Sequence, residues 1–191
     1  MTIKYVDGKY FYEDNPLEEV DLNKYKGWQK EDYEKAGIEF IEPMGAKDSM
    51  EKDIEDLFSN PQYYIDEKID GGRCLLHIFT DHSRAFSRNV VKKSGWLGEY
   101  TDKVPHIGRI SSLDLNGTVL DGELMIPDQP CNVTSGTLNC LAEESFKRQY
   151  FDVGFAVLYV FDIVRYKGDV VTHLPMLERR KLADRVVRPL S

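Results

Sequence analysis

Apolar runs, several of them alternating with polar residues, predict that strands dominate the chain from residue 63 onward. The segments 63–69, 73–80 and 84–91 are rich in β-branched and aromatic residues and are separated by turn-forming residues, as strands are. Residues 117–127 predict a further strand that is interrupted by acidic side chains. Residues 154–166 are apolar on both faces, as a central strand covered on both sides must be.

Other segments carry helix signals. Residues 47–61 combine a capping box, an apolar face and a terminating Asn60-Pro61 pair, and therefore predict a helix. The capping box is formed by Asp48 and Glu51, and the apolar face by Met50, Ile54, Leu57 and Phe58. Residues 141–149 and 175–187 predict two more helices, with Pro175 near the start of the second.

Two further regions give weaker helix signals. Asn15 is expected to cap a helix that has Pro16 at its first position and follows a short extended stretch. The looser region 94–117 is expected to contain one or two helices. Together these elements predict an α+β fold in which mostly antiparallel sheets are flanked by helices.

The size of the chain allows one well-filled core with a small appendage, since it has 191 residues of which 41% are apolar. Its net charge of −8 comes entirely from the first third. Residues 1–60 hold 16 carboxylates and 8 lysines, whereas residues 61–191 hold 17 carboxylates and 17 lysines and arginines. We therefore expect an acidic N-terminal extension over residues 1–41 and a separate main domain over residues 42–191.

Composition also excludes several classes of function. An acidic segment repels polyanions, so charge alone predicts no tight binding of nucleic acid. The chain lacks the ~18–20 consecutive apolar residues of a membrane span, and its polar start is unlike a signal peptide, so no membrane partner is expected. The three scattered cysteines form neither a disulfide framework nor a zinc site, and favour a reducing, cytoplasmic setting.

The most unusual cluster of polar residues surrounds Lys68. In a strand, side chains alternate, so Asp66, Lys68 and Asp70 would share one face. Gly71-Gly72 would then allow a tight reversal that brings Arg73 close to Lys68. Two neighbouring cations suit an anionic ligand such as a phosphate. The alternative is an exposed strand end with ordinary salt bridges.

Later strands add charged residues at costly positions. Arg88 lies near the end of the strand predicted over 84–91, and Glu123 interrupts an apolar run, where a carboxylate needs a metal, a ribose hydroxyl or a cation. Phe161 and Asp162 lie in the middle of the apolar segment 154–166. Phe161 alone is more typical of a core residue than of a cofactor contact, whereas Asp162 requires a partner, which a structural arginine would satisfy.

Four motifs occur in order along the chain: Lys68-Ile69-Asp70-Gly71-Gly72-Arg73, Ser87-Arg88-Asn89, Asp121-Gly122-Glu123 and Phe161-Asp162. Their order and spacing resemble the covalent nucleotidyltransferase superfamily, which contains ATP-dependent DNA ligases, RNA ligases and mRNA capping guanylyltransferases. The resemblance covers roughly residues 42–185 and is greatest to ATP-dependent DNA ligases. It implies an ATP-grasp-like adenylation domain. The compactness of the chain resembles small viral or phage enzymes.

The resemblance also implies roles for individual residues. Lys68 would attack the α-phosphate of ATP and form a lysyl-AMP intermediate. Asp66 would recognise the adenine edge, Arg73 and Arg88 would contact phosphate or ribose oxygens, and Phe161 would stack on adenine. Glu123 would contact the ribose or, together with Asp70, a Mg²⁺ ion. The AMP would then pass to the 5′-phosphate of nicked duplex DNA, and the enzyme would act as a cytoplasmic monomer, in the host cytoplasm if viral.

Two motifs of the superfamily do not occur after Phe161-Asp162, namely a Glu-Gly pair and a Lys-x-Lys sequence that grips the triphosphate. An OB-fold domain that carries much of the DNA contact is also missing. The resemblance therefore implies a C-terminally incomplete ligase with slow self-adenylation. An RNA ligase, a capping enzyme and a non-catalytic fragment whose acidic N-terminus meets a basic partner are the alternatives. A P-loop ATPase is excluded, because no Walker A sequence occurs.

Overall fold

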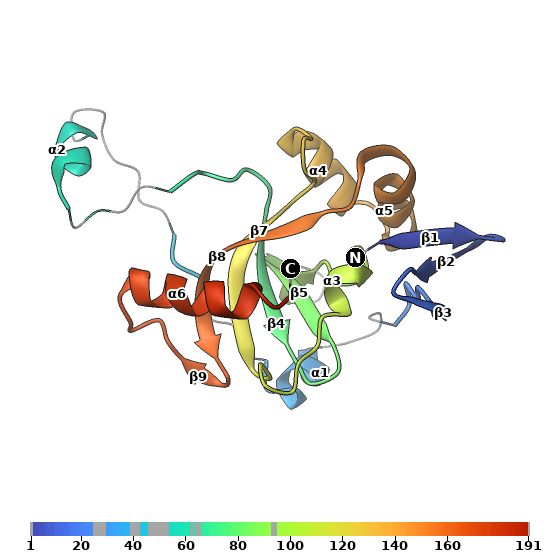
Figure 1. The fold of residues 1–191 in the computed structure, drawn as a ribbon, viewed down its shortest axis with the longest axis horizontal. Coiled ribbons are helices and arrows are strands. Elements are labelled where there is room, and N and C mark those ends of the chain that lie inside the picture. Colours follow the sequence, from blue (N-terminus) through green and yellow to red (C-terminus); the bar gives the residue numbers. More distant parts are fainter. Residues whose placement is uncertain are drawn as a thin grey trace.

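The structure, a computed structural model, describes residues 2–24, 30–38, 43–45, 54–61, 63, 66–92 and 95–190. Within these residues the chain forms a six-stranded sheet with helices around it and a separate three-stranded sheet near the N-terminus (Figure 1). All strand pairs are antiparallel. The predicted α+β class, with antiparallel sheets flanked by helices, is confirmed.

The large sheet has the strand order β6-β5-β4-β7-β8-β9. Its strands are β4 (Gly72–Ile78), β5 (Ser83–Val91), β6 (Trp96–Glu99), β7 (Thr118–Met125), β8 (Val157–Tyr166) and β9 (Asp169–Val170). Three of the predicted strands, over 73–80, 84–91 and 117–127, thus correspond to β4, β5 and β7. Their hydrophobic patterns are local signals that tertiary packing did not override.

Alternation of side chains gives the large sheet two different faces. Cys74, Leu76 and Ile78 of β4 join Leu120 and Leu124 of β7 in the main hydrophobic core. The helices that complete this core are α3 (Pro105–Gly108), α4 (Cys131–Leu138) and α6 (Met176–Val187). The intervening residues of β4 and β7 lie on the opposite face, which carries the polar residues discussed below.

On that opposite face, the β5 end of the sheet packs against helix α1 (Lys30–Lys35). Tyr33 of α1 contacts Phe86 edge-on and stacks on Trp96 at 5.5 Å between ring centroids. Beside these rings, the buried Arg84 donates a hydrogen bond to Glu99 at 2.7 Å, and the Tyr33 hydroxyl donates to Glu99 at 2.5 Å. Burial, together with the bond to Glu99, raises the pKa of Tyr33. This end of the face is therefore closed by structural contacts.

The N-terminal residues form a three-stranded meander, hereafter the meander, of β1 (Ile3–Val6), β2 (Lys9–Tyr12) and β3 (Asn15–Glu19). The predicted helix beginning at Asn15 is wrong, because these residues pair with β2. The Asn15 side chain donates to Glu18 and caps no helix. Pro16 is tolerated because β3 is an edge strand.

One arginine joins the meander to the main sheet's helices. Arg109, which follows α3, donates to Asp14 and Glu18 at 2.8 Å each. Its guanidinium also lies 4.3 Å from the ring centroid of Tyr12, whose hydroxyl reaches the Pro105 carbonyl. The meander therefore packs against the body of the molecule through a charged and aromatic contact.

The helix predicted over 47–61 is described only in part. Helix α2 spans Ile54–Ser59 and ends before Asn60-Pro61, as expected, whereas the proposed capping box of Asp48 and Glu51 lies outside the described residues, as does Met50. Figure 1 shows α2 standing apart from the sheet, and Ile54 and Phe58 on it are exposed. The expected burial of this apolar face is therefore wrong for these two side chains.

The region 94–117 contains a helix as expected, the short α3, and in addition the strand β6 within its described part.

Two other predictions need correction. The strand predicted over 63–69 does not form at Tyr63 or over 66–69, and Tyr64 and Ile65 lie outside the described residues. Strand β8 is not central, because its outer neighbour β9 pairs only with Arg165 and Tyr166. Its mixture of exposed and buried residues reflects that position.

The remaining predicted helices are present. Helix α5 (Ala142–Arg148) continues into a π-helical turn, η2 (Gln149–Val153), and α6 begins directly after Pro175. Helix α4 was not predicted, because it carries few apolar residues at helical spacing. Within the described part of the chain, no helix has the length and apolar character that a membrane span requires.

Candidate active site

Pairing of three adjacent strands brings the predicted motifs together. Arg73 of β4 lies opposite Glu123 of β7, which in turn lies opposite Tyr159 of β8. Two residues along β7, Asp121 lies opposite Asp162 of β8. The register between β7 and β8 shifts here and leaves Phe161 without a paired residue, as at a β-bulge. The first, third and fourth motifs thus meet on one face of the sheet.

Arg73 is the centre of this arrangement. Its Nε and one terminal nitrogen donate to the two Asp121 oxygens at 2.6 and 2.5 Å, which is a bidentate pair. The guanidinium carbon lies 4.6 Å from the ring centroid of Phe161, within the range of a cation–π contact. A further hydrogen bond reaches the Met44 carbonyl at 3.2 Å. Arg73 is therefore held by three segments of the chain.

Electrostatics keep this pair ionised. Asp121 is 1% exposed, and burial raises the pKa of its carboxyl, while the hydrogen bond from Arg73 opposes that rise. Burial lowers the pKa of Arg73, but the hydrogen bond and the charge of Asp121 outweigh burial and leave the pKa above its usual value. Since the geometry is bidentate, we take both groups as charged.

Glu123 is the second carboxylate of the site and has no ion pair in the described structure. It is partly buried and accepts a hydrogen bond from the Gly71 backbone. Burial raises the pKa of Glu123, whereas the charges of Arg73 and the exposed Arg88 lower it. A partly desolvated carboxylate between two arginines suits contact with a hydroxyl or a divalent cation.

Lys68 and Asp70 lie on the segment that leads into β4. The Lys68 side chain is 86% exposed and that of Asp70 is 69% exposed, with 3.4 Å between the ammonium nitrogen and the carboxylate oxygen. The structure therefore places Lys68 in solvent and not against Arg73, Glu123 and Phe161. The proposed role of Lys68 as nucleophile stays a prediction, and it requires this segment to move toward the sheet.

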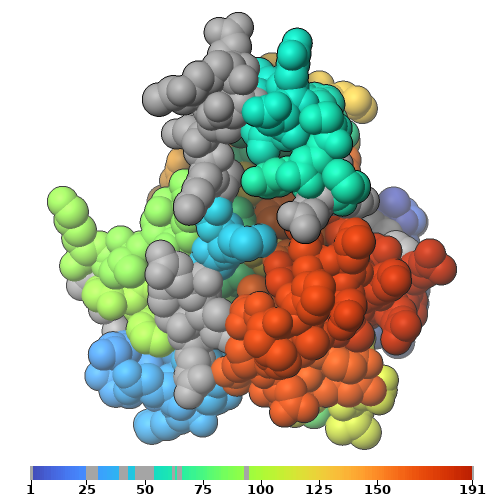
Figure 2. Space-filling view, turned by 90° about the vertical axis from the view of Figure 1, so that its left-hand side faces the viewer, coloured from blue at the N-terminus to red at the C-terminus, as the bar shows by residue number. Residues whose placement is uncertain are grey.

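Asp66 is held by helix α6. Arg180 donates hydrogen bonds to both Asp66 oxygens, and the bond lowers the pKa of this carboxyl. On the face shown in Figure 2, the segment that carries α2 lies directly above α6. The contact ties the start of the Lys68 segment to a helix far away in the sequence.

Gly71 and Gly72 have a different role from the one predicted. Gly72 is already paired with Leu124 of β7, and neither glycine has a positive φ, so the expected reversal toward Lys68 is wrong. A Cβ on Gly71 would lie 2.2 Å from the Leu124 carbonyl oxygen. Gly71 therefore permits close approach of the Lys68 segment to β7, which is a common use of glycine.

Asp162 has the arginine partner that its burial requires. Arg179 of α6 donates to its two oxygens at 2.8 Å each, and both side chains are less than a tenth exposed. The same arginine donates to the Leu174 carbonyl at 2.7 Å. Since Asp162 is satisfied in this way, it contributes to the site by fixing the backbone at Phe161.

Sequence reasoning assigned no role to Asp121, Arg179 or Arg180. Asp121 carries the same signal as Glu123, because it also interrupts the apolar run of β7. The two arginines are consecutive on α6, where a solvent-exposed face would be the ordinary expectation. Only the packing of α6 against β8 shows that both reach carboxylates of the site.

A family model described as "ATP dependent DNA ligase domain" matches residues 43–191. The chain belongs to the ATP-dependent DNA ligase family. It is 29% identical over 152 residues to DNA ligase 4 of Candida albicans, a match that covers 73% of this chain and 16% of that protein. It is 25% identical over 156 residues to DNA ligase 4 of Homo sapiens, covering 78% and 17% respectively.

An archaeal relative is similar: the DNA ligase of Saccharolobus shibatae is 25% identical over 131 residues, which cover 65% of this chain and 20% of that protein. The chain thus spans only a small part of each relative. Among solved structures, mycobacterial DNA ligase D complexed with ATP and MES aligns with a TM-score of 0.43 and 22% identity. That alignment covers 64% of this chain and 36% of the mycobacterial one.

Proposed function

We propose that this ligase domain carries out self-adenylation, in which the Lys68 amine attacks the α-phosphorus of ATP. A P–N bond forms, the bond to pyrophosphate breaks, and the lysine proton passes to solvent, to which the exposed side chain has open access. Only the neutral amine attacks, so the ammonium form of Lys68 has to lose a proton before the P–N bond can form.

The arrangement of Arg73, Asp121 and Phe161 carries the proposal. Because Asp121 fixes the guanidinium, Arg73 is preorganised to meet phosphate or ribose oxygens without a large loss of side-chain entropy. Phe161 is partly exposed beside it, so a base can stack on the ring. The exposed Arg88 adds positive charge near Glu123.

The donor set also fits a magnesium ion. Mg²⁺ takes oxygen ligands and is commonly held by one or two carboxylates together with substrate phosphates. Glu123 and Asp70 would supply the carboxylates, although no cluster of three possible ligands exists among the residues that the structure describes. When bound, the ion would neutralise charge on the triphosphate.

For the second step we propose nicked duplex DNA as the substrate, with AMP passing from Lys68 to its 5′-phosphate. Membership of a DNA ligase family supports this choice over RNA ligation and capping. The near-neutral balance of residues 61–191 leaves most of the DNA contact to other surfaces of the enzyme.

Mass spectrometry tests the first step directly. After incubation with ATP and Mg²⁺, the protein should gain the mass of AMP on the peptide that contains Lys68, and Lys68→Ala should abolish the gain. GTP in place of ATP, and a nicked RNA strand in place of DNA, separate the ligase from capping and RNA-ligase activities. An adduct that persists in Lys68→Ala, or that maps to another peptide, would refute the assignment.

A further inference from the structure

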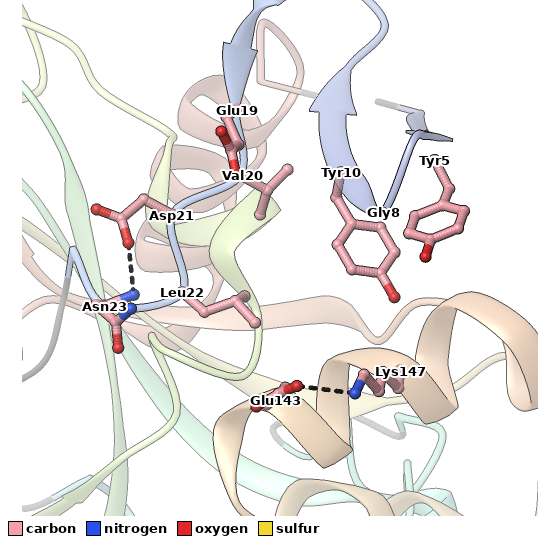
Figure 3. Close-up of a pocket in the computed structure, with 10 residues that line it drawn as sticks. All are labelled: Tyr5, Gly8, Tyr10, Glu19, Val20, Asp21, Leu22, Asn23, Glu143 and Lys147. Carbon is pink, nitrogen blue, oxygen red and sulfur yellow. Dashed lines mark hydrogen bonds and ion pairs between the residues drawn. The ribbon is translucent and has the colours of Figure 1, made fainter.

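A pocket lies between the meander and helix α5. Figure 3 shows it bordered by the β1–β2 hairpin, the segment after β3, and α5. It is open to solvent and has a volume of about 630 Å³, which is sufficient for a large side chain with its flanking backbone. Nothing in the proposed ligation chemistry uses it.

Aromatic rings form one wall of this pocket. Tyr5 and Tyr10 project from the hairpin toward α5, with 4.9 Å between their ring centroids (Figure 3). Tyr10 is supported from behind by edge contacts with Phe146 and Tyr150. Tyr5 is 44% exposed, so part of an anchored aromatic surface faces the open pocket. Such ring faces attract cations.

Three carboxylates also line the pocket: Glu19, Asp21 and Glu143. Lys147, the one cation among the described lining residues, is already paired with Glu143 at 2.8 Å, and Lys9 pairs with Glu19 at 2.7 Å. Asp21 differs, because its carboxylate accepts only the backbone N–H of Asn23 within the described structure. The Asp21 carboxylate, which has no cationic partner among the described residues, therefore lines the same pocket as Tyr5 and Tyr10.

The N-terminal residues around the pocket also carry a net negative charge. Residues 2–24 contain six carboxylates and three lysines. Burial raises the pKa of Tyr10, and the neighbouring tyrosines and Glu143 raise it further, whereas Lys147 alone lowers it. This environment opposes negative charge, so a phosphate backbone is a poor occupant and a cation is a good one.

We propose that the pocket binds an arginine side chain in a basic segment of a protein partner. A planar guanidinium can stack on the exposed Tyr5 ring, which a compact ammonium does less well, and a second cation of the same segment can pair with Asp21 on the other side of the pocket (Figure 3). The site is independent of nucleotide binding and adds a protein-docking surface to the ligase domain.

Titration with acetyl-Gly-Arg-Gly-Arg-Gly-amide, followed by NMR, tests the proposal. The backbone amides of Gly8, Asn23 and Glu143 should shift, and added salt should weaken binding. The same peptide with citrulline in place of arginine keeps the shape of the side chain but not its charge. We expect it to bind at least about fivefold more weakly, as the loss of a charge-assisted pair implies.

Two substitutions on opposite walls sharpen the test. Asp21→Asn keeps the acceptor for Asn23 and removes the charge, and Tyr5→Leu removes the π-face. Each should weaken the arginine peptide about threefold, as expected for an exposed ion pair or cation–π contact. Glu31→Gln on α1 removes one exposed charge away from the pocket and should leave affinity unchanged. Preserved NMR dispersion confirms that each variant is folded.

The proposal is overturned if the citrulline peptide binds as tightly as the arginine peptide, or if the shifts map elsewhere. It is also overturned if Asp21→Asn and Tyr5→Leu together leave the affinity unchanged, or if a DNA duplex shifts these amides when the peptide does not. Adenylation of Lys68 should be the same in Asp21→Asn and the native chain, so failure of docking and failure of the proposed function remain distinguishable.

Discussion

Arg180 of helix α6 donates hydrogen bonds to Asp66, which precedes it by 114 positions and lies two residues before Lys68. The family resemblance assigns Asp66 to recognition of the adenine edge, whereas in this structure its carboxylate accepts hydrogen bonds from an arginine. The helix therefore restrains the segment that carries the proposed nucleophile. Binding of nucleotide and loosening of this contact should be coupled.

Arg180→Ala should release that restraint. Because the segment 66–70 has no strand pairing, its backbone amides depend on this tether for order. Hydrogen exchange at residues 67–70 should become several-fold faster, while exchange in β4 and β7 should not change. Lys181→Ala, an exposed neighbour on the same helix, is the matched control. Equal exchange in Arg180→Ala and the native protein would contradict a restraining role.

Arg179→Met should be strongly destabilising, because it leaves the buried Asp162 carboxylate without its partner. We expect a loss of about 3 kcal/mol in the free energy of unfolding, measured by urea titration. Adding Asp162→Leu should restore most of that loss, since both charges are then absent. Arg185→Met, at an exposed position of the same helix, should change stability by less than about 0.5 kcal/mol.

If Arg179→Met alone is as stable as Arg185→Met, the Arg179–Asp162 pair does not hold α6 against β8. A stable double variant that still forms the Lys68 adduct would show that this pair supports the site only by fixing the backbone beside Phe161.

Gly71→Ala should push the Lys68 segment away from β7, because the added Cβ would meet the Leu124 carbonyl oxygen at 2.2 Å. We expect a loss of roughly 1–3 kcal/mol in unfolding free energy, as for other overpacked sites, and slower adduct formation. Gly136→Ala provides the control, since nothing lies within 4 Å of its Cβ position in α4. It should stabilise the protein by up to about 1 kcal/mol.

The buried His77 and the partly buried His106 should make stability depend on pH. Burial lowers the pKa of His77 to about 3 and that of His106 to about 4, so the unfolded chain binds protons that the folded protein does not. Stability should therefore fall as pH decreases from about 6.5 toward about 4. At pH 5 each imidazole should reduce the unfolding free energy by up to about 2 kcal/mol relative to neutral pH.

Urea titrations at several pH values between 7 and 5 measure the slope of the unfolding free energy against pH. His77→Leu should reduce it by about half, whereas His173→Gln should not alter it, because His173 is exposed. The raised pKa values of Asp121 and Glu123 act in the opposite direction, so the observed slope is a net value. A slope that is unchanged in His77→Leu would show that this histidine is protonated without loss of the fold.

Local sequence patterns were sufficient to predict several of the strands and helices that carry the site. The apolar alternation of β4, β5 and β7 and the helical period of α6 predict their positions within a few residues. The motif order allows Arg73, Glu123 and Phe161 to be proposed as neighbours, and the strand pairing confirms that they meet. The requirement of Asp162 for a partner also follows from its apolar surroundings alone.

Other features depended on contacts between distant residues. Asn15 and Pro16 carry helix-start signals, but pairing with β2 makes this segment a strand. The residues before β4 resemble a strand, yet β4 takes β5 and β7 as its neighbours and leaves 66–69 unpaired. Propensity is a weak influence of less than about 1 kcal/mol per residue, so pairing and packing override it.

The amino-acid sequence by itself determined which side chains the domain can use and the strands on which most of them lie, because alternation and apolar runs act over a few residues. Only the tertiary structure decided how the charges are paired: Arg73 with Asp121, Arg179 with Asp162, and Arg180 with Asp66. It also decided that Lys68 is exposed. These pairings and this exposure depend on which distant segments are packed together on folding, and a local sequence pattern contains no information about that.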